Sequence, residues 1–372
     1  MTDNLRIGVI FGGRSGEHEV SLVSARSVLD ALDPEKYDVT QIGISKEGTW
    51  YVGENVLKEM SAGEFSRLTP ATLLPIPGRS QLYLLLQKDG RSILKALTDL
   101  DVILPVLHGT FGEDGTIQGL LEMADLAYVG AGVLASSVGM DKGVFKDVML
   151  AHDIPVVPHR VLLRKSVEDN LEHVLDRAEG LASYPLFVKP ANLGSSVGVH
   201  KCRNRDELAR GLRDAARYDR RLLVEKGIDA REVELSVLGN DDPRVSIPGE
   251  IRPSAEFYSY EAKYHDDSSE LLIPAPLSEE QTTRFQDLAV KAFRAIDGAG
   301  MARVDFLMER DSGEIYLNEL NTIPGFTPIS MYPKLWEASG LDYPALIDEL
   351  IELALERRDE KDNTEWQFTR EA

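Results

Sequence analysis

Two short apolar runs that each end in glycine constrain the fold of this chain most. Residues 5–11, LRIGVIF, lead into Gly12 and Gly13, and residues 101–109, DVILPVLHG, end in the same way. Continuous apolar runs of this length are typical of strands buried on both faces of a parallel sheet. A helical pattern follows each run, and a second strand pattern occupies residues 37–45. This alternation predicts a doubly wound α/β domain at the N-terminus.

Length, charge and cysteine content narrow the class of protein. At 372 residues the chain is long for a single core, which predicts about two or three domains. A formal net charge of −21 argues against nucleic acid or an anionic membrane as a partner. The single cysteine, Cys202, excludes internal disulfides and multi-cysteine zinc sites, and it is expected to pack rather than react.

Three observations predict a cytoplasmic protein. No run reaches the roughly 18 apolar residues of a membrane span. The N-terminus enters a strand pattern without the layout of a signal peptide. A single cysteine also fits a reducing compartment.

Residues 300–325 predict a β-hairpin. The strand patterns ARVDFLM and EIYLNEL flank a turn at residues 311–313. If the loop consists of these three residues, Arg310 faces Glu314, and this opposite-charge pair suits the register. Counting back from that pair fixes the register of the whole hairpin.

The same count gathers polar side chains on one face of the hairpin. It pairs Asp305 with Glu319 and Arg303 with Asn321, and alternation places all four on the same side. Two carboxylates and an amide form a hard oxygen cluster that suits Mg²⁺ or Mn²⁺ holding a polyphosphate. The alternative is a solvated strand face with cross-strand ion pairs. A register error of one residue would scatter the cluster, so the hairpin alone leaves both interpretations open.

Further candidate residues lie at predicted loops and strand ends. Lys189 stands at the base of a Gly/Ser loop, residues 191–198, that could fold over phosphates or be a plain hairpin loop. Glu17 follows the first strand and could hold a substrate ammonium or favour a helix N-terminus. His108 closes a strand, where either a structural or a catalytic role is open. Lys142 lies four residues before Lys146, so both share a helical face, and solvent exposure is the default expectation.

One long polar segment predicts a lid. Residues 250–277 carry Lys263, Tyr264 and His265 between strand patterns. Loops of that length inside a compact domain tend to close over active sites.

Taken together, seven stretches resemble the ATP-grasp enzymes and, within them, the D-alanine–D-alanine ligases. The stretches are GGRSGEHEVSL, HGTFGEDGTIQG, MDK, FVKPANLGSSVGV, VEK, YEAKY and ARVDF…LNELNTIPGFT, in family order. The resemblance implies an α/β fold in which a doubly wound parallel-sheet (pre-ATP-grasp) domain precedes a two-subdomain α+β ATP-grasp fold. The implied parts are a substrate-binding domain at 1–138, a central subdomain with the Gly/Ser loop at 139–227, and a C-terminal subdomain with lid and metal site at 228–372.

The resemblance also implies a reaction. Two D-alanines are joined to D-alanyl-D-alanine at the expense of ATP, through a D-alanyl phosphate, for peptidoglycan precursor synthesis. Such chemistry needs cations to neutralise two approaching anions, a closed lid to exclude water, and a fixed positive donor for the tetrahedral oxyanion. The implied cofactors are ATP and two Mg²⁺ or Mn²⁺ ions, and a homodimer is the family expectation.

Residue roles follow from the matched motifs. The metal ligands implied are Asp305, Glu319 and Asn321. The ATP contacts implied are Lys142, Lys189, Ser195, Ser196, Glu225, Lys226, Ile228, Glu232, Lys263 and Asn318. The contacts implied for the two D-alanines are Glu17, His108, Arg303, Gly325, Ser330 and Met331. Catalytic roles fall to Glu17, Ser195, Tyr264, Arg303 and Ser330, with Arg303 as the oxyanion stabiliser.

Three alternatives compete with this interpretation. A resistance-type ligase would take D-lactate or D-serine second, but YEAKY with Tyr264 resembles the D-alanine type, and His265 lies one residue beyond. Another ATP-grasp carboxylate–amine ligase is disfavoured by HGTFGEDG and NTIPGFT. A catalytically dead paralogue predicts loss of a metal ligand, Arg303 or Lys263, and none is lost.

Overall fold

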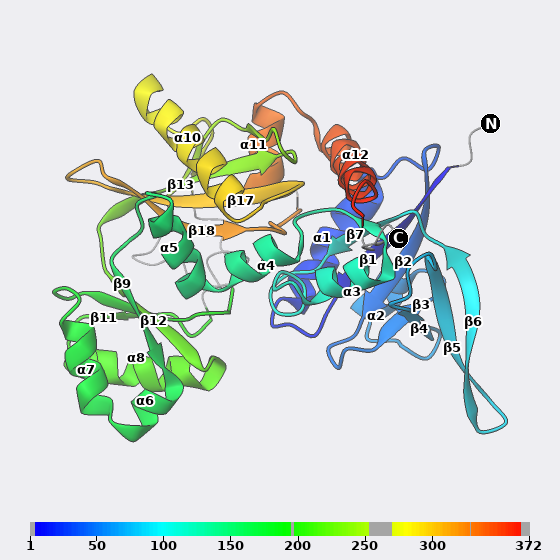
Figure 1. Ribbon diagram of the computed structural model, residues 1–372, viewed down its shortest axis with the longest axis horizontal. Helices are drawn as coiled ribbons and strands as arrows, with labels where there is room; N and C mark the ends of the chain where they lie inside the picture. The colour runs from blue at the N-terminus through cyan, green and yellow to red at the C-terminus, as the bar shows by residue number, and fades with distance from the viewer. Residues whose placement is uncertain (1–3, 195–196, 253–269, 328, 366–372) are drawn as a thin grey trace, which may run out of the picture.

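The computed structural model describes residues 4–194, 197–252, 270–327 and 329–365, which form three lobes built on three sheets (Figure 1). The mixed α/β architecture confirms the fold class expected from the sequence. Within these residues, none of the helices combines the length and apolar character needed to cross a membrane.

An eight-stranded sheet forms the N-terminal lobe. Its strands, in sheet order, are β6 (Arg91–Asp99), β5 (Gln81–Lys88), β4 (Thr69–Leu73), β3 (Trp50–Val52), β2 (Tyr37–Ile44), β1 (Leu5–Gly12), β7 (Val102–Val106) and β8 (Ala127–Tyr128). Strand β1 pairs in parallel with both β2 and β7, which confirms the doubly wound arrangement, and β3 to β6 extend the sheet in antiparallel fashion. Its helices are α1 (His18–Ala31), α2 (Val56–Ser61) and α3 (Thr116–Ala124).

A four-stranded antiparallel sheet forms the central lobe, after helices α4 (Val133–Met140) and α5 (Lys142–Ala151). Its order is β11 (His200–Cys202), β10 (Leu186–Pro190), β12 (Arg221–Lys226) and β9 (His159–Leu163), and it carries α6 (Arg164–Asp169), α7 (Leu171–Glu179) and α8 (Arg205–Tyr218). Cys202 is completely buried in the core of this lobe. Burial raises the pKa of its thiol to about 11, which confirms a packing role.

A six-stranded sheet forms the third lobe. Its strands are β13 (Ala230–Leu238), β14 (Arg244–Val245), β15 (Gly249–Arg252), β16 (Glu270–Leu272), β17 (Met301–Glu309) and β18 (Ile315–Asn321), with helices α10 (Glu279–Ala295) and α11 (Met331–Ala338). Helix α10 begins in a capping box between Ser278 and Gln281. Its Phe285 meets Phe306 of β17 edge-on, with ring centroids 5.3 Å apart, which fixes the helix on the hairpin strand.

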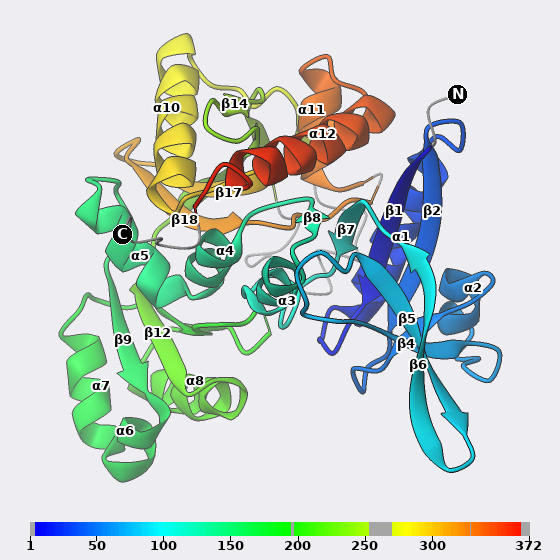
Figure 2. The same cartoon turned by 45° about the vertical axis from the view of Figure 1, so that its right-hand side comes forward.

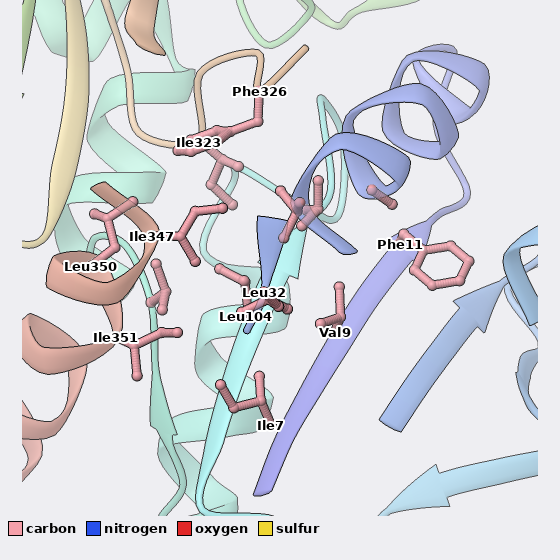
Figure 3. Close-up of a cluster of buried hydrophobic side chains, with 14 of the residues drawn as sticks. Ile7, Val9, Phe11, Leu32, Leu104, Ile323, Phe326, Ile347, Leu350 and Ile351 are labelled. Atoms are coloured by element: carbon pink, nitrogen blue, oxygen red, sulfur yellow. The ribbon is translucent and has the colours of Figure 1, made fainter. Parts of the chain in front are cut away.

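The last helix, α12 (Tyr343–Lys361), packs on the N-terminal sheet although it follows the third lobe in the chain (Figure 2). Its Ile347 and Leu350 belong to the same buried cluster as Ile7 of β1 (Figure 3). The C-terminal segment therefore connects the third lobe to the first, and these two lobes share one apolar core.

We predict that Leu350→Ala destabilises the protein by about 2–5 kcal/mol, because it leaves a cavity where α12 meets the N-terminal sheet. Leu350 is only 1% exposed. Thermal unfolding followed by circular dichroism measures the effect. The matched control, Glu352→Ala, changes an exposed residue of the same helix and should leave the melting temperature nearly unchanged. Equal melting temperatures for the two variants would contradict the proposed packing.

Candidate active site

The β17–β18 hairpin places the predicted polar face as the sequence indicated. Asp305 pairs with Glu319 and Arg303 with Asn321. The side chains Val304, Phe306 and Leu320 on the other face are buried, as expected. These pairings bring the candidate metal ligands together on adjacent strands.

The register near the turn was predicted wrongly. Glu314 is paired with Glu309 and not with Arg310. The backbone amide of Glu309 donates to the carbonyl of Glu314 at 2.9 Å. Arg310 instead forms an ion pair with Asp229 at 3.1 Å. A bulge between Asp305 and Phe306 shifts the register by one residue. The error at the turn and the bulge cancel, so the face beyond the bulge has the expected pairs.

Arg303 is a fixed cation at the centre of this face. Its Nε and Nη2 each lie 2.7 Å from an oxygen of Asp305, and Nε lies 3.0 Å from Oε2 of Glu234 on β13. Burial disfavours the charge, but the two carboxylates more than offset it and hold the pKa of Arg303 well above its usual value. Asn321 also donates to Asp305 at 3.0 Å. The arginine is therefore held in place and charged.

The predicted ligand set fits a hard divalent cation. Asp305, Glu319 and Asn321 offer only oxygen ligands from two paired strands. Within the described ranges, no group of three or more His, Cys, Asp or Glu side chains is arranged to hold a metal ion. Two carboxylates and an amide leave coordination positions for phosphate oxygens and water, which is how Mg²⁺ is usually bound beside a nucleotide.

Lys142, the first residue of α5, connects this face to the Gly/Ser loop. Its backbone amide donates to the carbonyl of Ala191 at 3.0 Å, and its Nζ donates to the carbonyl of Leu193 at 2.9 Å. The same Nζ lies 3.8 Å from Oε2 of Glu319. Asp141 caps the helix by accepting from the amides of the first turn, so the lysine has a defined position.

Glu225 holds two buried lysines. Lys146 of α5 lies 2.7 Å from its carboxylate, and Lys189 of β10 lies 2.6 Å away on the other oxygen. Burial opposes ionisation of Glu225, but the two ammonium groups outweigh it and lower its pKa. Lys146 is only 1% exposed, so the expectation of a solvated lysine was wrong. The reason is that its side chain reaches the Glu225 carboxylate on β12 instead of water.

Three loops converge on Glu17. A Cβ atom added to Gly109 would lie 2.4 Å from Oε2 of Glu17, and one added to Gly194 would lie 2.8 Å from the same oxygen. Gly109 has a positive φ of 74°, which favours glycine, and at both positions the Glu17 carboxylate approaches the backbone closely. Glu17 comes from the β1 loop, Gly109 from the β7 loop and Gly194 from the Gly/Ser loop, so the first and central lobes meet at this carboxylate.

His108 is fixed by contacts at both ring nitrogens. Its Nδ1 lies 3.1 Å from the carbonyl of Ile323, and its Nε2 lies 2.9 Å from Oγ of Ser24. The carbonyl requires a proton on Nδ1, so Nε2 accepts from the hydroxyl in a neutral ring. Burial lowers the pKa of His108 and favours that neutral form. The imidazole thus joins α1 and the β7 loop to the segment after β18.

One pocket contains groups from all three lobes. Its lining includes Glu17, His108, Glu113, Lys142, Gly194, Arg303, Glu319, Asn321 and Gly325. Seven of these residues were singled out from the sequence, and Glu113 and Gly194 were not assigned roles. Three carboxyl groups, a fixed arginine and a lysine therefore border one space.

The remaining candidates lie around this pocket or outside the described residues. Glu232 lies on β13. Lys226 ends β12, and Ile228 follows it in the link between the central and third lobes. Asn318 lies at the bulge of the hairpin. Ser330 accepts from the amide of Thr327 at 3.1 Å. Met331 is 5% exposed and packs in an apolar cluster. Outside the described residues lie Ser195, Ser196, Lys263, Tyr264 and His265.

Sequence reasoning missed three charged groups of this region. Glu234 lies directly opposite Asp305 on β13, and its strand pattern could have revealed it once the pairing was known. Glu113 belongs to the same glycine-rich stretch as His108. Lys146 gave no usable signal, because nothing in the helical spacing tells a buried lysine from an exposed one.

Two family models match this chain. The model described as D-ala D-ala ligase N-terminus matches residues 6–131, and the one described as D-ala D-ala ligase C-terminus matches residues 148–352. Among curated relatives, the D-alanine–D-alanine ligase of Heliobacterium modesticaldum is 51% identical, with 95% of this chain and 96% of that protein covered. The enzyme of the same name from Natranaerobius thermophilus is 49% identical, with 98% and 99% covered.

Solved structures agree with these matches. The D-alanine–D-alanine ligase from Coxiella burnetii superimposes with a TM-score of 0.81 at 38% identity, covering 97% of each chain. A D-Ala:D-Ser ligase from Enterococcus faecalis gives a TM-score of 0.83 at 34% identity, covering 95% of this chain and 100% of that one. Both share the arrangement of lobes over nearly the entire length.

We predict that Glu225→Gln destabilises the protein by about 3–5 kcal/mol, because it leaves two buried ammonium groups without a counter-charge. ATP binding should weaken with it, since Lys189 loses the partner that positions it. Melting temperature and nucleotide titration by calorimetry measure the two effects. The control, Asp169→Asn, removes an exposed partner of Lys165 and should alter neither. Normal stability and affinity in Glu225→Gln would contradict the role given to this cluster.

Proposed function

This chain belongs to the D-alanine–D-alanine ligase family, and we propose on that premise how its residues perform the reaction. The enzyme uses ATP to join two D-alanines to D-alanyl-D-alanine, a step of peptidoglycan precursor synthesis. The observation that carries the proposal is the single pocket in which Glu17, Arg303 and Glu319 face one another. One group can hold an ammonium, one can hold an oxyanion, and one can hold a metal.

The first D-alanine binds through its ammonium at Glu17. This carboxylate lies within the pocket, close to the backbone of Gly109 and Gly194. The carboxylate of this D-alanine then points toward the phosphate-binding lysines, where it attacks the γ-phosphate of ATP. Closure of the segment with Lys263 and Tyr264 would keep the resulting acyl phosphate from water, and Ser195 would link that segment to Glu17.

Arg303 stabilises the tetrahedral oxyanion that forms when the second D-alanine attacks. Its guanidinium is charged and held by Asp305 and Glu234, so little reorganisation is needed as negative charge develops. The second D-alanine is held by Gly325 and Ser330, with its carboxylate at the Ser330 hydroxyl. Met331 contributes its backbone, since its side chain is buried in an apolar cluster.

ATP lies between the central and third lobes. Lys142 and Lys189 bind its phosphates, together with Ser195, Ser196 and Lys263. The adenine lies along the end of β12 at Glu225, Lys226 and Ile228, Glu232 contacts the ribose, and Asn318 borders the phosphates. The fixed position of Lys189 against Glu225 supports this placement.

Asp305, Glu319 and Asn321 would hold two Mg²⁺ or Mn²⁺ ions. The ions would neutralise phosphate charge and so permit the approach of a second anion. The three proposed ligand residues offer only oxygen atoms and lie on two paired strands, and both features support the assignment. Arg303 then shares Asp305 with the metal site and couples it to the oxyanion position.

The domain roles and the cellular setting complete the proposal. Residues 1–138 bind substrate, 139–227 and 228–372 clamp ATP, and the last helix of the third segment closes back onto the first. We propose a cytoplasmic homodimer, as is general for the family. The consumption of ATP and the buried free thiol of Cys202 suit that compartment.

D-Alanine is the preferred second substrate over D-lactate or D-serine. The relatives near 50% identity carry the D-alanine–D-alanine ligase name, whereas the D-Ala:D-Ser ligase is 34% identical. We expect ATP, Mg²⁺ and D-alanine alone to release phosphate and yield D-alanyl-D-alanine by mass spectrometry. A depsipeptide or D-alanyl-D-serine as main product in competition would contradict this preference, and ATP binding without turnover would indicate an inactive paralogue.

Arg303→Met should lower kcat by about 10²–10³-fold, because the oxyanion loses its charged donor. Binding of Mn²⁺ with ATP, followed by electron paramagnetic resonance, should persist in this variant. Asp305→Ala should instead abolish the bound Mn²⁺ signal along with turnover. Unchanged metal binding in Asp305→Ala would show that the ligand set is assigned wrongly.

A further inference from the structure

Glu113 is a third acidic group in the pocket beside Glu17 and Glu319, and the reaction described above leaves it without a role. It lies on the loop between β7 and α3 and lines the same space as Glu17, Arg303 and Gly325. Its Oε2 accepts a hydrogen bond from the backbone amide of Gly109 at 2.6 Å. Within the described part of the chain, no lysine, arginine or histidine forms an ion pair with it.

The two carboxylates both approach Gly109, but they differ in their other neighbours. Glu17 also approaches Gly194 of the Gly/Ser loop. Glu113 lies on the side of Ile323, whose backbone favours its ionised form. Ile323 precedes Gly325 by two residues, in the segment assigned to the second D-alanine. Glu113 is thus the carboxylate on the acceptor side.

The second D-alanine arrives as an ammonium and must lose a proton before its nitrogen can attack. Arg303 and Lys142 are cations and cannot accept that proton. Glu17 is committed to the first ammonium, and His108 uses both ring nitrogens within the protein. Glu319 is assigned to the metal ions, so Glu113 is the described carboxylate of the pocket that is left for this task.

We infer that Glu113 is the general base that deprotonates the second D-alanine, an inference that rests on the proposed placement of the two substrates. The carboxylate takes one proton from the ammonium. The freed lone pair attacks the acyl carbon and forms the C–N bond, which gives the tetrahedral oxyanion held by Arg303. When this adduct collapses, the C–O bond to phosphate breaks with its electron pair on the phosphate, and the leaving phosphate takes the second N–H proton, so that a neutral amide remains. The proton on Glu113 passes to solvent when the site opens.

The electrostatic setting suits a base that works near neutral pH. Burial and the neighbouring charge of Glu17 raise the pKa of Glu113. The amides of Gly109 and Ile323 and the charge of Arg303 lower it by less, so the pKa of Glu113 is about 8. His108 is neutral beside it, and Lys142 and Glu319 border the same pocket. A base is most effective when its pKa lies close to the working pH. The ionised fraction rises with pH through this value.

The test compares two acceptors in Glu113→Gln. Hydroxylamine is uncharged at neutral pH, so it traps the acyl phosphate as D-alanyl hydroxamate without a base. We expect dipeptide formation to fall about 100-fold or more while hydroxamate formation stays near the wild-type rate. The rise of kcat/KM for the second D-alanine near pH 8 should also disappear. The amide retains an oxygen for Gly109, which preserves the loop.

Asp114→Asn is the matched control, because Asp114 shapes the same loop by accepting from the amides of Phe111 and Thr116. Any effect of that substitution should lower both acceptor reactions equally. Equal losses with both acceptors in Glu113→Gln, or no loss with either, would overturn the assignment. A wild-type enzyme that forms neither product would instead refute the proposed reaction itself.

Discussion

The candidate active site depends on an arginine that is largely buried and yet charged. Burying a guanidinium costs free energy unless carboxylates surround it, and Asp305 and Glu234 supply that compensation from adjacent strands. The consequence is a positive centre whose position is set by β-sheet pairing instead of by a mobile loop. Groups that must act on developing charge are best placed on such rigid elements.

The same principle organises the phosphate side. Glu225 lies between Lys146 and Lys189, so one buried carboxylate orients two cations. Lys146 comes from α5 and Lys189 from β10, which locks the helix onto the central sheet. Lys142, at the start of that helix, is thereby directed to both the Gly/Ser loop and Glu319. In a chain with a net charge of −21, the cations of the site are thus concentrated by local pairing.

Much of this arrangement could be predicted from the sequence, and the failures have physical causes. The glycine-ended runs led to the parallel sheet, and alternation on the hairpin gave the correct partners for Asp305 and Arg303. The bulge was invisible because no residue pattern specifies an extra residue in one strand. Lys146 was misjudged because burial depends on what covers a helix face. The packing of α12 on the first lobe is likewise a long-range contact that local patterns do not encode.

The glycines around Glu17 connect the carboxylate proposed to bind substrate to the geometry of the Gly/Ser loop. Gly194 and Gly109 both let the Glu17 carboxylate approach their backbones closely. A shift of either loop therefore changes the space in which an ammonium can reach Glu17. Because Lys142 binds the carbonyl of Leu193, next to Gly194, movement of the phosphate lysine and of the ammonium site is mechanically linked. In the binding arrangement that we propose, the first D-alanine and ATP would contact one shared loop, and this contact would give each a direct route to influence the position of the other.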